Sequence, residues 1–181
     1  MSYILTASGI KIDPLHPEPE QINIHDIAHS LVKICRFNGH CHGFYSVAEH
    51  SIRVSREVPI AHKLTALLHD ATEAYIGDMV SPIKRRMAPY RKMEENLWRC
   101  IAEKFELPEK IPHAVNHADL VLLATEKRDL MPPDDREWPM LNGVEPTKEV
   151  LRRVATWDYD FELWRDSFTQ EFVKLTNCTT I

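Results

Sequence analysis

The chain has 181 residues, of which 44% are hydrophobic, and this size and composition are typical of one globular domain. Its net charge of −5, from 22 basic and 27 acidic residues, argues against binding to duplex nucleic acid, because such proteins present a basic face. No run approaches the ~18 apolar residues of a membrane span, and the N-terminus lacks the basic and apolar regions of a signal peptide, so we expect a cytoplasmic protein without membrane contact.

Hydrophobic periodicity and turn residues predict an all-α bundle in a single domain, 1–181, preceded by a small β-hairpin. The elements are expected in this order: a hairpin over 3–12, a Pro-marked loop over 13–20, helices over about 23–35, 46–57, 61–75, 90–105 and 113–130, a long Pro-rich loop over 131–146, and two closing helices within 147–177. The core of the domain is predicted over about 23–130.

Several single residues support these boundaries. Ser46 and Glu49 have the spacing of a capping box at the start of a helix. Gly77 is suited to a left-handed C-cap, and Thr147 is a candidate cap for the first closing helix. Tyr75 and Trp98 are interpreted as core residues.

The four cysteines lie far apart and form no C-x-x-C unit. In a chain without an export signal, this pattern predicts reduced thiols and neither a disulfide framework nor a zinc knuckle. The cysteines are Cys35, Cys41, Cys100 and Cys178.

The pair His69-Asp70 is the strongest chemical signal in the sequence. It follows three consecutive apolar residues, Ala66 to Leu68, and Glu73 comes one helical turn later. Burying such polar groups costs several kcal/mol unless they are paired or bind a cation. A His-Asp dipeptide alone is weak evidence for a metal site, because on its own it is more often a surface pair.

Two further residues strengthen the metal interpretation. His50 lies on the preceding helix among apolar residues, and Asp119 lies on a later helix whose other face is apolar. Two imidazoles and two carboxylates form a mixed shell that suits one divalent ion, with Mn, Co, Zn, Fe and Mg all compatible. Glu73 is spaced i+3 from Asp70 and therefore lies on the same helical face, within reach of a metal-bound water.

Other histidines have spacings that could support a metal. Both i, i+4 pairs lack the Glu of H-E-x-x-H, and the third pair flanks a cysteine in a predicted loop, so we favour structural or exposed roles for all of them. The pairs are His25 and His29, His113 and His117, and His40 and His42.

The ordered motifs resemble those of the HD-domain metal-dependent phosphohydrolases, in particular the bacterial 5′-deoxynucleotidases and the phage-type proteins that include dATP triphosphohydrolases. The likeness extends from about 23 to 130. The residues that carry it are Arg36, His50, His69-Asp70, Glu73, Gly77-Asp78, Lys84 and Asp119, within the runs CRFNGH, FYSVAEHS and LLHDATEAYIGD.

The resemblance implies a role for each matching position: metal ligation by His50, His69, Asp70 and Asp119; acid–base catalysis by Glu73 and Asp78; and phosphate binding by Arg36 and Lys84. The 5′-deoxynucleotidases place a Trp after the Arg, beside the deoxyribose, whereas this chain has Phe37 there. Structural alternatives stay open, since Lys84 could belong to a solvated basic face and Asp78 could cap the next turn.

The resemblance therefore implies hydrolysis of a small nucleotide, with a deoxynucleotide favoured, by a 5′-monophosphatase or a dNTP triphosphohydrolase. The alternative is a non-catalytic HD module that binds a nucleotide in signalling or assembly. An HD-type nuclease would need a basic groove that the net charge does not indicate. The resemblance also favours a homo-oligomer, for which the segment 138–141 (WPML) offers apolar contact surface.

Overall fold

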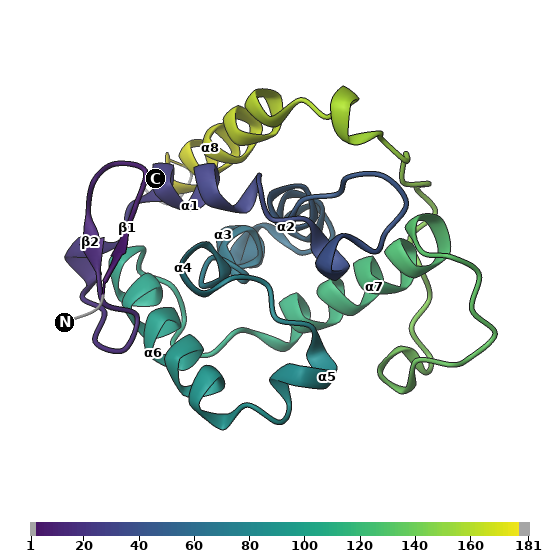
Figure 1. Cartoon of the computed structure of the whole chain (residues 1–181), viewed down its shortest axis with the longest axis horizontal. Coiled ribbons are helices and arrows are strands. Elements are labelled where there is room, and N and C mark those ends of the chain that lie inside the picture. The colour runs from purple at the N-terminus through teal and green to yellow at the C-terminus, as the bar shows by residue number, and fades with distance from the viewer. Residues whose placement is uncertain (1–2, 178–181) are drawn as a thin grey trace.

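The computed structural model describes residues 3–177 and is mainly helical, with one small antiparallel hairpin (Figure 1). This confirms the predicted helical class and the N-terminal hairpin. The strands are β1 (Ile4–Leu5) and β2 (Lys11–Ile12). The helices are α1 (Ile24–Leu31), α2 (Val47–Arg56), α3 (Lys63–Leu68), α4 (Glu73–Ile76), α5 (Ser81–Lys84), α6 (Ala88–Lys104), α7 (His113–Leu130) and α8 (Phe161–Asn177), with short 3-10 turns between several of them.

Helices α2 and α3 pack against each other in the middle of the molecule, and α1, α7 and α8 surround α2 (Figure 1). Of the ten residues of α2, eight are buried, including His50 and Glu49. The apolar ones, such as Val47 and Ile52, each contribute roughly 1.5–3 kcal/mol by leaving water. Because α2 is enclosed on several sides, its polar residues also lie in the interior and need partners there.

The start of α2 confirms the predicted cap, but only one half of the capping box. The Ser46 hydroxyl accepts a hydrogen bond from the backbone N–H of Glu49 at 3.0 Å. The Glu49 carboxylate does not return to Ser46 and instead accepts two hydrogen bonds from Arg53, one turn further along the helix. The ion pair with Arg53 therefore replaces the reciprocal bond.

The prediction that the first helix reaches Cys35 is wrong, since α1 ends at Leu31. The N–H of Arg36 donates to the carbonyl of Tyr45, and the N–H of Val47 donates to the carbonyl of Ile34, both at 3.0 Å. The short extended stretch 34–36 thus pairs with 45–47, and this pairing takes the backbone groups that a longer helix would use.

The single helix predicted over 61–75 is also wrong, because the structure has α3 and α4 with tight turns between them. The ring Nδ1 of His69 binds the carbonyl of Ala66 at 2.7 Å, which is the acceptor that a continuing helix would use. The next backbone bonds span three residues, from Ala71 to Leu68 and from Glu73 to Asp70. The chain resumes as α4, and this helix ends before Gly77, as predicted. Gly77 has a positive φ of +79°, which favours glycine, but its ψ of 163° differs from that of the predicted left-handed helical cap.

No α-helix begins at Thr147, so the first predicted closing helix is wrong, while the second is present as α8. The stretch after Thr147 runs along the end of α7, and its backbone donors bind side chains of that helix. The Thr147 N–H donates to Thr125 Oγ1 at 2.9 Å, and the Leu151 N–H donates to Asp129 Oδ2 at 2.8 Å. These tertiary bonds satisfy donors that a local helix would otherwise pair.

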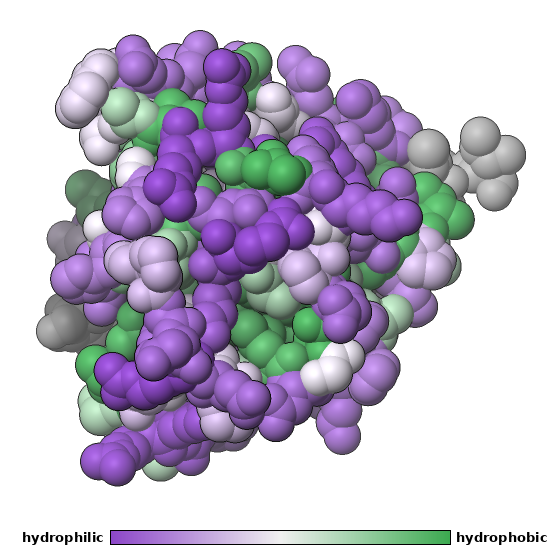
Figure 2. Space-filling view, turned by 90° about the vertical axis from the view of Figure 1, so that its right-hand side faces the viewer, coloured by the Kyte–Doolittle hydropathy of each residue, from purple (hydrophilic) through white to green (hydrophobic). Residues whose placement is uncertain are grey.

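Cys35, Cys41 and Cys100 are free thiols, as predicted, and Cys178 lies outside the described residues. Tyr75 and Trp98 are buried in the core, also as predicted. Among residues 3–177, no helix combines the length and apolar character needed to cross a bilayer. The face shown in Figure 2 is mainly hydrophilic, with hydrophobic side chains gathered in several separate patches.

Candidate metal centre

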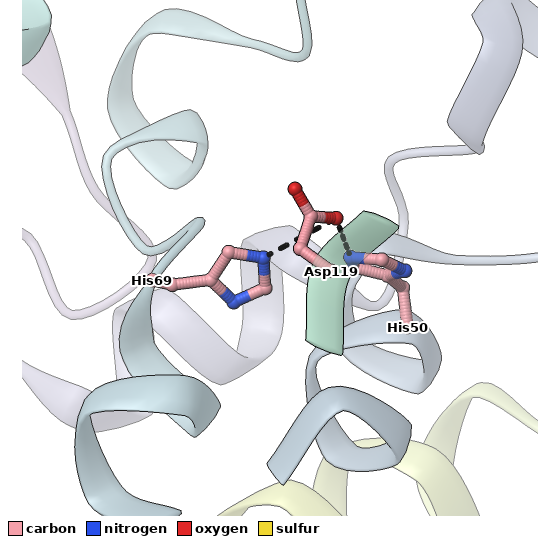
Figure 3. Close-up of side chains that lie close together, drawn as sticks. All are labelled: His50, His69 and Asp119. Carbon is pink, nitrogen blue, oxygen red and sulfur yellow. Dashed lines mark ion pairs between the residues drawn. The ribbon is translucent and has the colours of Figure 1, made fainter. Parts of the chain in front are cut away.

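Three separate stretches of chain bring histidine and aspartate side chains to one point. His50 comes from the middle of α2, His69 from the turn after α3, and Asp119 from α7, and Figure 3 shows both rings directed toward the Asp119 carboxylate. Asp119 Oδ1 lies 3.1 Å from His50 Nε2 and 3.9 Å from His69 Nε2. One candidate ligand atom from each residue lies within 4.8 Å of the others, a spacing that one metal ion can bridge.

Asp70 completes the group predicted from the sequence. Its Oδ2 atom lies 3.2 Å from His69 Nε2 and 3.6 Å from His50 Nε2. The close group of potential ligands comprises His50, His69 and Asp119, and Asp70 lies beside both imidazoles as the candidate fourth ligand that the sequence predicts.

The outer nitrogen of each imidazole is held by a hydrogen bond that sets the tautomer. His50 Nδ1 lies 2.6 Å from Glu126 Oε1, and His69 Nδ1 lies 2.7 Å from the carbonyl oxygen of Ala66. A carbonyl or an ionised carboxylate can only accept, so Nδ1 carries the proton in both rings. The Nε2 lone pairs are then free to face the centre, which is the usual arrangement of metal-binding histidines.

The two Nε2 atoms give a direct test of whether a cation fits. Both are buried, and neither makes a hydrogen bond with any of the residues that the structure describes. An unsatisfied buried polar atom costs roughly 1–3 kcal/mol, so two of them facing two carboxylates need a common partner. A divalent cation satisfies all four groups, and the mixed nitrogen and oxygen donors suit any of the ions predicted from the sequence.

The charges at the centre favour a cation as well. Burial lowers the pKa of His50, but Glu126 and Asp119 outweigh burial and raise it to about 9. Burial lowers the pKa of His69 too, and Asp70 reverses this effect and raises it. Burial raises the pKa of Asp70, yet its histidine neighbours hold the pKa below the ordinary value. The carboxylates therefore favour positive charge at the centre, which is supplied by protons on Nε2 of the imidazoles when no metal is bound and by a metal ion when it takes the place of those protons.

A cavity of about 420 Å³ opens beside the centre. Larger hollows of about 520 and 690 Å³ lie elsewhere on the surface, and none of the predicted site residues lines either of them. His69 lines a second hollow of about 420 Å³, which Asp70, Lys84 and Asp119 also line. The predicted site residues that line the first cavity are Arg36, Phe37, Asp70, Glu73, Asp78, Lys84 and Asp119.

Glu73 and Asp78 are carboxylates suited to accept a proton. Glu73 is the first residue of α4, and its Oε2 atom is buried without a hydrogen-bond partner in the described chain. Burial raises the pKa of Glu73 well above its ordinary value, and Asp70 adds to this effect. Burial likewise raises the pKa of Asp78, which follows the end of α4.

The two cations of the cavity already have carboxylate partners. The Arg36 guanidinium contacts Glu126 Oε2 at 3.1 and 3.2 Å and lies 3.5 Å from Asp70 Oδ2. Lys84 forms an ion pair with Glu94 of α6. An incoming phosphate would therefore compete with these carboxylates for Arg36 and Lys84. Phosphate binding by the two cations, which the resemblance implied, is weaker than it would be for unpaired side chains.

The turn that presents Arg36 and Phe37 is conformationally strained. Phe37 and Asn38 have φ values of +56° and +51°, in the left-handed region that bulky residues rarely adopt. Such strain persists only where the surrounding structure imposes it, and it is concentrated at ligand and catalytic sites. The turn thus fixes the direction of both side chains at the cavity.

Sequence reasoning missed Glu126, which is fully buried and joins His50 to Arg36. Its one signal is its position seven residues after Asp119, which places both acids on the same face of α7. Trp138, predicted as apolar contact surface between subunits, also lines the cavity, as does His40.

Histidines of two rival pairs contact other protein side chains. His29 Nε2 lies 2.7 Å from Lys33 Nζ, and the rings of His113 and His117 stack at 6.5 Å. Within residues 3–177, none of the rival pairs belongs to a close group of three potential ligands.

Comparisons with known proteins give two clear relatives. The chain is 45% identical to the uncharacterized protein YfdR of Escherichia coli strain K12 over 148 residues, which cover 82% of this chain and 83% of the relative. It is 34% identical over 162 residues to an uncharacterized protein of Rhodobacter capsulatus, covering 82% of each chain. No family model matches the sequence.

Proposed function

We propose that this chain, which belongs to the family of the Escherichia coli protein YfdR, is a metal-dependent phosphohydrolase of the HD-domain type. Its substrate would be a small nucleotide, with a deoxynucleotide preferred. The observation that carries the proposal is the convergence of His50, His69, Asp70 and Asp119 beside a cavity that contains further acids.

Those four residues would hold the ion, and the chemistry that it supplies is a lowering of the pKa of a bound water from ~15.7 towards ~7. Glu73 has an unpartnered carboxylate oxygen in the same cavity and can orient a water and accept its proton. Asp78 lines that cavity too, and its protonated form, which burial favours by raising the pKa, can donate its proton to the leaving oxygen.

Arg36 and Lys84 would offset the charge that develops on the phosphate oxygens. Against these two cations the cavity wall carries four acids: Asp70, Glu73, Asp78 and Asp119. With all four acids ionised, these side chains carry a net charge of −2 that repels a phosphate dianion, and the two charges of the ion cancel it. Binding of a phosphate ester should accordingly depend on the divalent metal.

The choice of a nucleotide rests on the resemblance to the 5′-deoxynucleotidases and the phage-type triphosphohydrolases, together with aromatic residues in the cavity wall. Both monophosphates and triphosphates are therefore substrates to test. The ring of Phe37 stands where the nucleotidases have Trp, on the strained turn beside Arg36.

The experiment is a panel of ribo- and deoxynucleoside mono- and triphosphates, incubated with purified protein and Mn²⁺, Co²⁺ or Mg²⁺. Elemental analysis of the same protein measures bound metal, and chromatography separates phosphate, pyrophosphate and triphosphate products. We expect turnover of a deoxynucleotide that stops when the metal is removed with a chelator. Metal-loaded protein that hydrolyses none of the panel would overturn the proposal, and nucleotide binding without hydrolysis would identify a non-catalytic module.

A further inference from the structure

We propose that Trp138 is a specificity-determining residue that receives the base of the nucleotide in the cavity beside the candidate metal centre. This inference rests on the proposed function, because it assigns the phosphate to the metal and the base to the aromatic wall of the same cavity. It gives the segment 131–146 a role in substrate selection instead of, or besides, contact between subunits.

The first observation is the apolar and aromatic surface in the cavity wall. Phe37, Leu123, Met131 and Trp138 contribute to this surface, and Met79, Val80 and Pro82 add apolar groups next to Asp78 and Lys84 in the chain. A phosphate ester must place its phosphate at the metal. The rest of the molecule then meets the apolar region, where a flat and largely apolar ring is the group that gains most from contact.

The second observation is that Trp138 is held in place by its own surroundings. The Lys127 ammonium lies 5.1 Å from the centre of the indole ring, and Lys127 also donates to the carbonyl of Arg136 at 2.9 Å. The carbonyl of Trp138 accepts from the N–H of Leu141 at 2.8 Å. The Lys127 ammonium therefore contacts the indole itself, and the two backbone bonds hold the segment that carries it, which lowers the entropic cost of binding.

The third observation concerns the ring that faces Trp138. The centroids of Phe37 and Trp138 are 6.4 Å apart, and their planes are tilted by 54°. This is ordinary aromatic contact, and because both side chains are only half-buried, each ring keeps accessible surface. They form an open aromatic corner whose walls come from the strained turn after α1 and from the segment after α7, more than 90 residues apart in the chain.

Any of the four bases can stack on such a surface. Stacking contributes roughly 1–3 kcal/mol of binding free energy per base, as measured by substitution of the aromatic residue with alanine. The indole therefore should separate nucleotides from other phosphate esters, and it should contribute little to the choice among the four bases.

The test compares dAMP with 2-deoxyribose 5-phosphate, two ligands that share the sugar and the phosphate and differ by the base. Calorimetry gives the Kd of each for Mn²⁺-loaded protein carrying Glu73→Gln, so that bound ligand is not consumed. In this background, Trp138→Ala should weaken binding of dAMP by about tenfold and leave binding of the sugar phosphate within about twofold. Trp138→Phe should retain most of the dAMP affinity, and Trp138→Leu, which keeps apolar bulk without an aromatic face, should lose it.

Trp157→Ala is the matched control, because Trp157 is 87% exposed and does not line the cavity. Thermal unfolding of every variant verifies that the fold is intact. Equal weakening of both ligands, unchanged binding of dAMP in Trp138→Ala, or absence of dAMP binding in the parent protein would each overturn the inference. Base-dependent binding that needs Trp138, combined with no hydrolysis by the wild-type protein, would leave the inference in place and overturn the phosphohydrolase function.

Discussion

His50 and Glu126 form a fully buried hydrogen bond, with 2.6 Å between Nδ1 and Oε1, and the same carboxylate also binds Arg36. Burial raises the pKa of Glu126, but Arg36 and His50 outweigh this and lower it, so the carboxylate is ionised. One acid from α7 thereby orients a candidate metal ligand on α2 and a candidate phosphate ligand at the start of the strained turn.

The first prediction concerns that acid. Glu126→Gln keeps the shape but weakens the acceptor, and the loss of such a partner typically costs 10–100-fold in metal affinity. We therefore expect the metal Kd, measured by competition with a chromophoric chelator, to rise by about that factor while the fold persists. Glu149→Gln, at a side chain that is 60% exposed, is the control and should not change the metal Kd. Unchanged metal affinity in Glu126→Gln would show that the orientation of His50 does not depend on this bond.

A second prediction follows from the burial of Arg36 against Glu126. Among residues 3–177, Glu126→Ala removes the carboxylate nearest to the Arg36 guanidinium and leaves the buried charge with Asp70 at 3.5 Å. Breaking a buried pair in this way costs roughly 3–5 kcal/mol of unfolding free energy. Urea denaturation should show this loss in Glu126→Ala and a much smaller one in Glu126→Gln. Equal stability of Glu126→Ala and wild type would mean that solvent or another side chain reaches Arg36.

A third prediction separates metal ligands from the proposed base. His69→Ala and Asp70→Ala should abolish both bound metal and turnover, because each removes a donor from the centre. Glu73→Gln should keep the metal and lose roughly 10²–10⁴-fold in kcat, the usual contribution of a positioned acid or base. Elemental analysis and the nucleotide assay measure the two properties separately. His113→Ala removes a histidine from an exposed rival pair and is the control, so it should change neither property. Retained activity in His69→Ala or Asp70→Ala would place the metal elsewhere.

Local signals in the sequence were enough to predict the elements that carry the centre. The run before His69, the cap at Ser46 and the start of α7 at His113 are all encoded within a few neighbouring residues, and the structure agrees at each. The same runs supplied the four candidate ligands, because polar groups at the end of a buried apolar stripe need a partner wherever the helix packs.

The parts that could not be predicted depend on contacts between distant residues. Glu126 lies 76 residues from the imidazole that it binds. The break after α3 occurs because the His69 ring competes for a backbone carbonyl, which helical periodicity does not reveal. The stretch after Thr147 loses its predicted helix because Thr125 and Asp129 of α7 take its donors. Tertiary hydrogen bonds overrode local preference in both cases.

A fourth prediction tests how the stretch after Thr147 is packed. Gly43 has a φ of +82°, and a Cβ atom there would lie 2.2 Å from the carbonyl oxygen of Val154. We expect Gly43→Ala to lower the unfolding free energy by more than ~2 kcal/mol, since left-handed backbone costs an alanine roughly 1–2 kcal/mol even without a clash. Gly143→Ala is the matched control, because Gly143 has a φ of +75° with open space around it, and it should show the backbone cost alone. Equal effects in urea denaturation would mean that Val154 does not approach Gly43 in solution.

The last prediction concerns the thiol next to Arg36. The sulfur atoms of Cys35 and Cys41 are 3.8 Å apart. The hydrogen bond from Cys41 lowers the pKa of Cys35 to about 6, against the opposing effect of burial, and it raises the pKa of Cys41. An acid with a lowered pKa is ionised above that value, so Cys35 should react with iodoacetamide at pH 7 and lose reactivity as the pH falls through about 6. Peptide mass spectrometry gives the rate for each cysteine separately, and Cys100, whose pKa is raised by burial, should react slowly.

Cys41→Ala removes the donor and should move the midpoint of Cys35 toward the ordinary ~8.5. A wild-type midpoint already near that value would show that the two thiols do not share a proton.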